Sequence, residues 1–268
     1  MNLIEEVSRR LDAVESLLPD LRHLLTTMQN EDLQIRTKSS HRDLVTKADV
    51  ASEKMILELL QDRFSNDRIL AEESGMHEAH DNVSDQLTWC IDPVDGTINY
   101  AHGLPLYSVS LGIMYNSKPV GGVVFLPALN DVYRGVVGMG ATKNGHSIHV
   151  STNTDLEAGL VVTGFPYNRL EILDLLTDSM RSVLKAARGI RRTGSAALDL
   201  CWLAEGRFDG HYEWNLSPWD TCGGVSILYA SGGRATNLAG DEFQFTDKLL
   251  VATNGHVHDQ LLKVLQSV

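Results

Sequence analysis

Residues Cys90-Ile91-Asp92-Pro93-Val94-Asp95-Gly96-Thr97-Ile98-Asn99-Tyr100 place two aspartates three positions apart, directly after an apolar run. The run 87–91 predicts a buried strand. Pro93 restricts the backbone between the two acids, and Gly96 permits a tight turn. Both carboxylates can therefore converge on one small volume at the end of this strand.

Two interpretations of this stretch stay open when it is taken alone. Two carboxylates without a neutralising charge repel each other and resist ionisation, and a divalent cation removes that conflict. Ligation by oxygen alone indicates Mg²⁺ or Mn²⁺. The other interpretation is a common local structure, an Asp-Pro turn followed by an aspartate that caps a helix.

Further acids stand at the ends of other predicted elements. Glu72 and Glu73 follow the apolar run 69–71, at a strand terminus. Asp220 precedes an apolar segment near a helix start, where a lone aspartate is usually an N-cap. Asp49 is expected on the exposed side of a helix, where a solvated or capping acid is the ordinary alternative. The sequence alone does not show that these segments meet in space.

Composition narrows the class of protein. The chain has 268 residues, a formal charge of −12, 43% hydrophobic residues and 22% charged residues. These values exclude a disordered or fibrous chain and allow a large buried core. The negative charge argues against nucleic acid or an anionic membrane as a partner. An anionic small substrate remains compatible, because bound cations invert the local field.

The expected location is the cytoplasm. The three cysteines are widely spaced and form no CxxC pair, which is typical of reduced thiols and excludes a disulfide framework or zinc cluster. The N-terminal stretch is amphipathic and acidic, without the apolar core of a secretory signal. The longest apolar stretch, 119–129, is interrupted and too short to span a bilayer.

Hydrophobic periodicity predicts layered α and β structure. The first half contains one or two N-terminal helices interrupted at Pro19, a helix at 44–63, strands near 68–71 and 87–92, and an antiparallel meander of three strands over 106–137. The second half alternates: strands near 159–163, 189–192 and 207–213, and helices near 169–187, 196–205, from Trp219 and over 256–266. No linker or repeat divides the chain, so we expect a single domain, 1–268, with an α+β half at about 1–150 and an α/β half at 151–268.

Four motifs in order make the chain similar to the inositol monophosphatase family, from about Ile35 onward. They are Asp92-Pro-Val-Asp95-Gly-Thr97-Ile-Asn-Tyr100, Trp219-Asp220-Thr-Cys-Gly-Gly224, Ala71-Glu72-Glu73-Ser74, and the stretch from Lys38-Ser39-Ser40 to Asp49. The resemblance implies an αβαβα sandwich of the inositol monophosphatase and fructose-1,6-bisphosphatase type. It also implies a lithium-sensitive phosphatase with two to three Mg²⁺ ions, Mn²⁺ being possible, and a homodimer.

The same resemblance assigns metal ligands. Glu72, Asp92 and the Val94 carbonyl would hold one ion, with Glu72 also facing a weaker third ion. Asp92, Asp95 and Asp220 would hold the second. Such ions neutralise the phosphate, lower the pKa of a bound water and stabilise the leaving oxygen.

Catalytic and substrate-binding roles follow in the same way. Glu72, Thr97 and Asp49 are the catalytic residues that the resemblance implies, with Thr97 hydrogen-bonded to Asp49 and orienting the attacking water. Gly96 and Thr97 would receive the phosphate through their backbone N–H groups. Asp95 would also contact the alcohol part of the substrate, together with Gly194, Ser195, Ala196 and Glu213.

The predicted activity is hydrolysis of myo-inositol monophosphate by a metal-activated water. The same chemistry on fructose 1,6-bisphosphate, 3′-phosphoadenosine 5′-phosphate, NADP or histidinol phosphate is the alternative, because the metal acids do not discriminate among these esters. A non-catalytic regulatory protein that kept the metal site is the third possibility. Two departures from the common family pattern, Tyr100 in place of phenylalanine and Cys222-Gly223 in place of two alanines, remove no predicted ligand.

Overall fold

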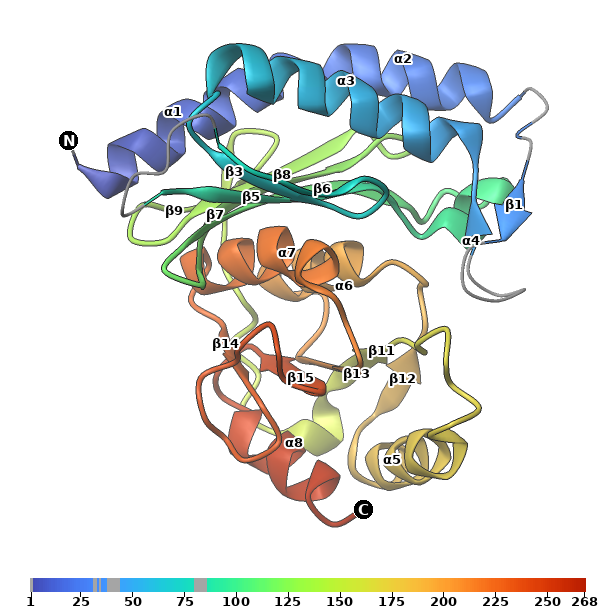
Figure 1. The fold of residues 1–268 in the computed structure, drawn as a ribbon. Coiled ribbons are helices and arrows are strands. Elements are labelled where there is room, and N and C mark those ends of the chain that lie inside the picture. Colours follow the sequence, from blue (N-terminus) through green and yellow to red (C-terminus); the bar gives the residue numbers. More distant parts are fainter. Residues whose placement is uncertain (1, 31–32, 34, 38–43, 80–85) are drawn as a thin grey trace.

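The protein is built from five layers (Figure 1). The computed structural model describes residues 2–30, 33, 35–37, 44–79 and 86–268. An outer layer of helices covers an eight-stranded sheet, a central pair of helices follows, and a five-stranded sheet with two more helices completes the stack. The predicted αβαβα sandwich is therefore confirmed. The boundary expected at about residue 150 stays a prediction.

The large sheet contains the strand that carries the two aspartates. Its order is β10-β9-β8-β7-β6-β5-β3-β4. The strands are β3 (Arg68–Ala71), β4 (Gly75–His77), β5 (Thr88–Asp95), β6 (Ser108–Tyr115), β7 (Lys118–Leu126), β8 (Asp131–Val136), β9 (Gly140–Lys143) and β10 (His146–Ile148). Strands β6, β7 and β8 form the predicted antiparallel meander. Strand β3 pairs with β5 in parallel, so the carboxyl ends of both strands reach the same edge.

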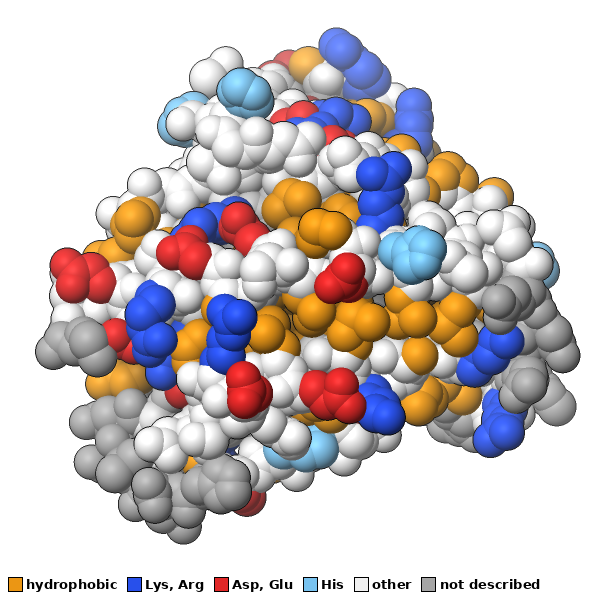
Figure 2. All heavy atoms as spheres, turned by 90° about the horizontal axis from the view of Figure 1, so that it is seen from above, with side chains coloured by type: hydrophobic (Ala, Val, Ile, Leu, Met, Phe, Trp, Pro, Cys, Tyr) orange, Lys and Arg blue, Asp and Glu red, His pale blue; other side chains and the backbone are white. Residues whose placement is uncertain are grey.

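Three helices cover the outer face of this sheet: α1 (Leu3–Glu15), α2 (Leu18–Met28) and α3 (Lys47–Arg63). Pro19 divides α1 from α2 because it lies in the first turn of α2, where its missing N–H costs no hydrogen bond. Helix α3 begins three residues later than predicted, since β2 (Leu44–Val45) pairs with β1 (Arg36–Thr37). On the outer face, side chains of both charges are interspersed with hydrophobic ones (Figure 2).

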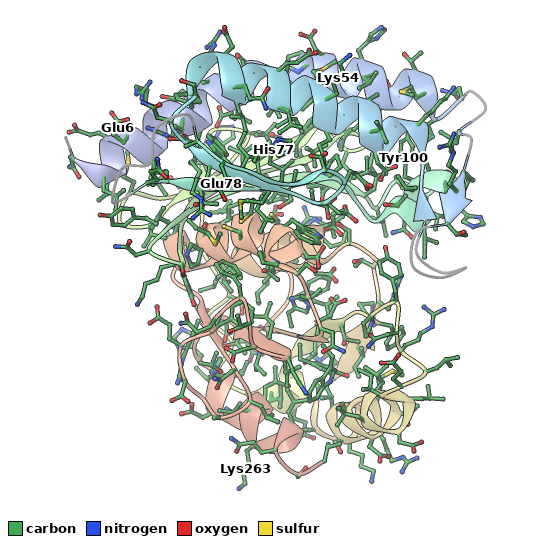
Figure 3. The ribbon with its side chains drawn as sticks, viewed as in Figure 1. Glu6, Lys54, His77, Glu78, Tyr100 and Lys263 are labelled. Atoms are coloured by element: carbon green, nitrogen blue, oxygen red, sulfur yellow. The ribbon has the colours of Figure 1, made fainter. Side chains whose placement is uncertain are left out.

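The central layer consists of α6 (Ala196–Ala204) and α7 (Pro218–Ala230). Residues 221–228 of α7 are all buried, because a sheet lies on either side of the helix. A helix that is covered all round carries no amphipathic pattern. The sequence therefore predicted only the start of α7. It placed the start at Trp219, and the helix begins at Pro218. Side chains fill the spaces between the layers (Figure 3).

The small sheet has the order β12-β11-β13-β15-β14. Its strands are β11 (Leu160–Thr163), β12 (Gly189–Arg191), β13 (Gly210–Trp214), β14 (Arg234–Thr236) and β15 (Leu249–Thr253). Helices α5 (Leu173–Ala186) and α8 (His258–Leu265) pack on its outer face, and a short 3-10 helix (Leu156–Ala158) precedes β11. No helix in the described ranges is both long and apolar enough to cross a bilayer.

Candidate active site

A cavity of about 400 Å³ opens where the two halves of the chain meet, at the carboxyl end of β5. Every predicted site residue except Asp49 lines it. From the first half come Glu72, Asp92, Val94, Asp95, Gly96 and Thr97; from the second half come Gly194, Ser195, Ala196, Glu213 and Asp220. Segments more than a hundred residues apart in the sequence therefore form one site.

The end of β5 is shaped so that both of its aspartates face inward. The pairing of β5 with β6 is irregular between Asp92 and Asp95. Asp92 Oδ1 accepts a hydrogen bond from the backbone N–H of Val94, at 3.0 Å. Gly96 then has φ 91°, the left-handed region that favours glycine, and it precedes α4 (Thr97–Ala101). A Cβ at Gly96 would lie 3.1 Å from the Gly194 carbonyl oxygen, so the turn also needs glycine for space.

The acids are buried close to one another, and their pKa values respond. Burial raises the pKa of Asp92 well above its ordinary value, with further increases from Glu72, Asp95 and Asp220. Burial likewise raises the pKa of Asp220, with Asp95 and Glu72 adding to it. The pKa of Asp95 is raised to about 6, because burial outweighs the hydrogen bonds from Ser195 and Ala197.

These residues fit a hard divalent cation. All the candidate ligand atoms are oxygens, and the buried carboxylates of Asp92 and Asp95 lie beside the partly exposed Glu72 and Asp220, which is the crowding of like charges that a cation relieves. The pairing of β3 with β5 produces the arrangement: the backbone N–H of Glu72 donates to the Ile91 carbonyl at 3.0 Å, which places Glu72 beside Asp92. Within the described part of the chain, the carboxylate oxygens of Asp92, Asp95 and Asp220 do not all lie within 4.8 Å of one another.

Asp49 was expected on the exposed side of its helix, and that expectation is wrong: the residue is fully buried. Its Oδ2 accepts hydrogen bonds from the backbone N–H and the hydroxyl of Thr46, at 2.9 and 2.6 Å, which closes a capping box at the start of α3. Such a box turns the side chain back toward the helix start, which here abuts the end of β5. Burial raises the pKa of Asp49 above its ordinary value.

Thr97 links Asp49 to the cavity. Its Oγ1 lies 3.1 Å from Asp49 Oδ1 and 3.0 Å from the Val94 carbonyl oxygen. The hydroxyl has one hydrogen to donate, so these two acceptors compete for it, and its lone pairs remain able to accept. Residues 38–40, which belong to the motif that leads to Asp49, lie outside the described residues.

Around Asp95, the second half of the chain supplies the two shortest hydrogen bonds, and the Ser108 hydroxyl in β6 donates a longer one at 3.4 Å. Asp95 Oδ2 accepts from the Ser195 hydroxyl at 2.6 Å and from the backbone N–H of Ala197 at 2.8 Å. Ser195 is also the N-cap of α6. The start of this central helix is thus tied directly to the end of β5. On the far side of the cavity Glu213, in β13, is 8% exposed.

Sequence reasoning missed two buried neighbours of Glu213. Asp199, His211 and Glu213 place their ligand atoms within 4.8 Å of one another. His211 could have been found from the period-2 alternation of a strand, because it stands two residues before Glu213 and so shares its face. Asp199 carries no comparable signal, since it comes from α6.

Cysteine does not take part in this chemistry. All three cysteines are free and buried, as their spacing predicted. Burial raises the pKa of Cys222 well above its ordinary value, as does its neighbour Cys90. A thiol held in this protonated state is a poor nucleophile, in keeping with its interpretation as a small apolar filler.

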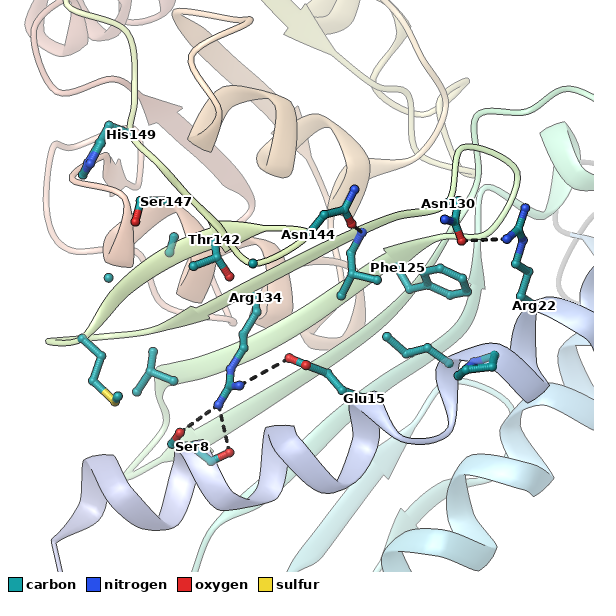
Figure 4. Close-up of a pocket in the computed structure, with 18 residues that line it drawn as sticks. Ser8, Glu15, Arg22, Phe125, Asn130, Arg134, Thr142, Asn144, Ser147 and His149 are labelled. Atoms are coloured by element: carbon teal, nitrogen blue, oxygen red, sulfur yellow. Dashed lines mark hydrogen bonds and ion pairs between the residues drawn. The ribbon is translucent and has the colours of Figure 1, made fainter.

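A larger groove of about 1000 Å³ lies elsewhere, between α1 and strands β8 and β9 (Figure 4). Arg134 crosses it and bonds to the Ser8 hydroxyl and to Glu15, while Arg22 bonds to Asn130. No predicted site residue lines this groove, so its size does not make it the active site.

Comparisons with known proteins agree with the geometry. The model of the inositol monophosphatase family matches residues 11–268. The chain is 39% identical to the inositol-1-monophosphatase of a Synechocystis strain over 232 residues, which cover 87% of this chain and 80% of the relative. It is 36% identical to the fructose-1,6-bisphosphatase/inositol-1-monophosphatase of Thermotoga maritima, over 97% and 96% of the two chains.

The solved structure of inositol monophosphatase from Anabaena superposes with a TM-score of 0.88 at 37% identity, and covers 98% of this chain and 97% of that one. Family and fold are therefore matched over almost the entire length. The chain belongs to the inositol monophosphatase family, a family of phosphoric monoester hydrolases.

Proposed function

We propose that the protein hydrolyses myo-inositol monophosphate to inositol and phosphate in a Mg²⁺-dependent reaction. The observation that carries the proposal is the cluster of buried acids at the end of β5, beside the buried pair of Asp49 and Thr97. The family supports hydrolysis of a phosphate monoester, and the names of two relatives support an inositol ester.

The acids are the proposed metal ligands. Glu72, Asp92 and the Val94 carbonyl would hold one Mg²⁺, and Asp92, Asp95 and Asp220 a second; a third ion would be weaker and would face Glu72. When bound, the ions neutralise the phosphate dianion, lower the pKa of water and stabilise the leaving oxygen. Mn²⁺ offers a similar preference for oxygen ligands.

Thr97 and Asp49 are proposed to handle the proton. When the Thr97 hydroxyl donates to Asp49 rather than to the Val94 carbonyl, its lone pairs are free to accept from the attacking water and orient it. Asp49 is buried with a raised pKa, which suits a carboxylate that takes up a proton through Thr97. Glu72, on the same cavity wall, is the third proposed catalytic group.

The substrate is proposed to span the two halves of the site. The backbone N–H groups of Gly96 and Thr97 would bind phosphate oxygens at the start of α4. The alcohol would lie against Asp95, Glu213 and the 194–196 turn, which line the same cavity. Carboxylates accept hydrogen bonds from hydroxyls, so this side favours a polyol.

A second substrate is favoured by one finding. The Thermotoga maritima relative carries fructose-1,6-bisphosphatase in its name beside inositol-1-monophosphatase. Fructose 1,6-bisphosphate is also a polyol phosphate, so the same acids and the same Glu213 side would serve it. Comparing kcat/KM for the two esters ranks the substrates, and equal values would contradict the inositol preference.

The first test is phosphate release from inositol 1-phosphate with Mg²⁺, then with EDTA, then with added lithium. We expect turnover that requires the metal and is suppressed by lithium. Turnover with fructose 1,6-bisphosphate alone would keep the chemistry and replace the substrate. If folded protein hydrolyses no phosphate ester at all, the result would instead favour a non-catalytic regulatory protein that has kept the metal site.

We also propose a cytoplasmic homodimer. The proposal rests on the family and on the reduced state of the three cysteines. Sedimentation equilibrium should give twice the chain mass of 29.5 kDa. A mass that stays at that of a single chain across the concentration range would contradict the dimer.

A further inference from the structure

Glu213 belongs to a buried cluster whose other two members have no role in the proposed reaction. Its neighbours are His211, in the same strand β13, and Asp199, in α6. Alternation along a strand puts His211 and Glu213 on one face. His211 is fully buried, whereas Glu213 reaches the cavity. The histidine therefore lies behind the glutamate as seen from the substrate.

A single hydrogen bond joins the two side chains. His211 Nε2 lies 3.2 Å from Glu213 Oε2. An ionised carboxylate can only accept, so Nε2 carries the proton and donates. His211 Nδ1 is buried and has no hydrogen-bond partner among the described residues. The bond to Glu213 is thus the polar contact that the structure gives this imidazole.

The other neighbours of Glu213 confine it without bonding to it. A Cβ on Gly164 would lie 1.9 Å from Glu213 Oε1 and 2.4 Å from Oε2, so the whole carboxylate rests directly against the backbone of residue 164. Asp199 accepts a hydrogen bond from the Thr193 hydroxyl at 2.5 Å, and burial together with the neighbouring Glu213 raises the pKa of Asp199 well above its ordinary value. Of the three neighbours, His211 is the one whose side chain forms a hydrogen bond with Glu213.

We propose that His211 is a positioning residue that holds the Glu213 carboxylate in the orientation that receives a substrate hydroxyl. The inference rests on the proposed function, because it assumes that Glu213 contacts the polyol. The bond to His211 occupies Oε2 and orients the carboxylate plane. Oε1, held at Gly164, is left to accept from the substrate. Loss of the bond removes the hydrogen bond that the structure gives this carboxylate, so its orientation toward the substrate is no longer fixed.

The test compares substrates with and without hydroxyls. His211→Phe keeps the ring and removes the donor, whereas the amide nitrogen of His211→Gln can reach the position of Nε2. With inositol 1-phosphate we expect KM to rise about 10-fold in the phenylalanine variant, as for loss of a hydrogen bond to a charged group. kcat should change by less than about 3-fold. With phenyl phosphate, which offers Glu213 no hydroxyl, kcat/KM should stay unchanged, and glutamine should restore most of the lost affinity.

His258→Phe is the matched control, because His258 is also a fully buried histidine but lies at the start of α8, outside the cavity. It should leave KM unchanged for both esters. An equal change for both esters in His211→Phe, or an unchanged KM for inositol 1-phosphate, would overturn the positioning role. A wild-type protein without any turnover would instead refute the proposed function.

A second measurement needs no turnover and no variant. In the Mg²⁺-loaded protein with ¹⁵N-labelled histidine, the ring shifts of His211 should report a protonated Nε2 at neutral pH. An unprotonated Nε2 would mean that the ring faces a cation or adopts the other tautomer. Either result would overturn the inference, whatever the enzyme does.

Discussion

At the scale of single residues, the site places like charges where solvent cannot screen them. Asp92 is nearly completely buried and surrounded by Glu72, Asp95 and Asp220. Such carboxylates destabilise the fold unless a cation or protons neutralise them. The proposed metal ligands therefore destabilise the metal-free fold. Removing one of them should lower activity without lowering the stability of the metal-free protein.

Asp92→Asn tests this opposition. It removes the acid proposed to bridge both ions, and we expect kcat/KM to fall by roughly 10³-fold, the rate equivalent of several kcal/mol of lost charge stabilisation. The fold should remain intact, and in EDTA the melting temperature should not fall, since a repelled charge is gone. Phosphate release and thermal unfolding measure the two effects. A variant with most of its activity would contradict the two-ion assignment.

His258 also makes the free energy of unfolding depend on pH, but in the direction opposite to that of the carboxylates with raised pKa values. Burial lowers its pKa to about 4, and its ring nitrogens bond to the hydroxyls of Thr236 and Thr253. Below its ordinary value of 6.5, the unfolded chain binds the proton that the folded chain refuses. The stabilisation is therefore full above that value and is lost as pH falls toward 4.

The lowered pKa of His258 corresponds to about 3 kcal/mol of stability. His258→Phe should remove this contribution to the pH dependence of the free energy of unfolding. Urea unfolding at a series of pH values should show the difference in free energy of unfolding between wild type and variant shrinking from about pH 7 to pH 4. A constant difference would mean that the imidazole is not held neutral.

At the scale of elements, the position of α7 depends on glycines in the sheet beneath it. A Cβ on Gly122 in β7 would lie 2.6 Å from the Gly223 carbonyl oxygen, and one on Gly112 in β6 would lie 2.5 Å from the Gly223 nitrogen. The backbones of helix and sheet are thus in direct contact. Because α7 carries Asp220 in its first turn, this contact also sets the distance between Asp220 and the acids of β5.

Gly122→Ala should therefore affect stability and activity together. The added methyl group meets backbone atoms that cannot turn aside, and we expect the free energy of unfolding to fall by about 1–3 kcal/mol, with a lower kcat as Asp220 is displaced. Gly189→Ala in β12 is the control, since its nearest neighbours are 3.6 Å away. Its stability should change by no more than about 0.5 kcal/mol. Equal effects of the two substitutions on unfolding would contradict the packing argument.

At the scale of the whole molecule, the chain carries a net charge of −12, and the acids clustered in the cavity have raised pKa values. For Asp95 the folded pKa is about 6, against an ordinary 3.8. The folded protein then binds more protons than the unfolded chain, so without metal this group destabilises the fold above about pH 6 and ceases to do so as pH falls toward 3.8. Asp92, Asp220 and Asp49 shift in the same direction.

Metal and protons should therefore compete. The increase in melting temperature that saturating Mg²⁺ produces should be large at about pH 7.5 and much smaller at about pH 5.5, where protons already neutralise the cluster. Differential scanning calorimetry with Mg²⁺ or EDTA at both pH values measures it. An increment independent of pH would show that the raised acids are not the ones that bind the metal.

Local patterns in the sequence predicted many of the elements and the ends at which the acids stand. Apolar runs ending at Ala71 and Ile91 predicted the strands that precede Glu72 and Asp92, and both strands are present. The motif around Asp95 and Gly96 predicted a tight turn, and Gly96 makes that turn at φ 91° before α4 begins. Local patterns carry this information because a strand end, a turn and a helix start each depend on a few neighbouring residues.

Which of these ends meet depends on how the elements pack together in the folded chain. Parallel pairing of β3 with β5 puts Glu72 beside Asp92, and the packing of α7 on the sheet brings in Asp220. The exposure expected for Asp49 failed for the same reason, because a neighbouring strand end, which no local pattern reveals, covers the start of α3. His211 and Asp199 stayed unnoticed until two elements packed together around Glu213. Burial and charge interactions depend on neighbours distant in the sequence, so the fold has to supply them.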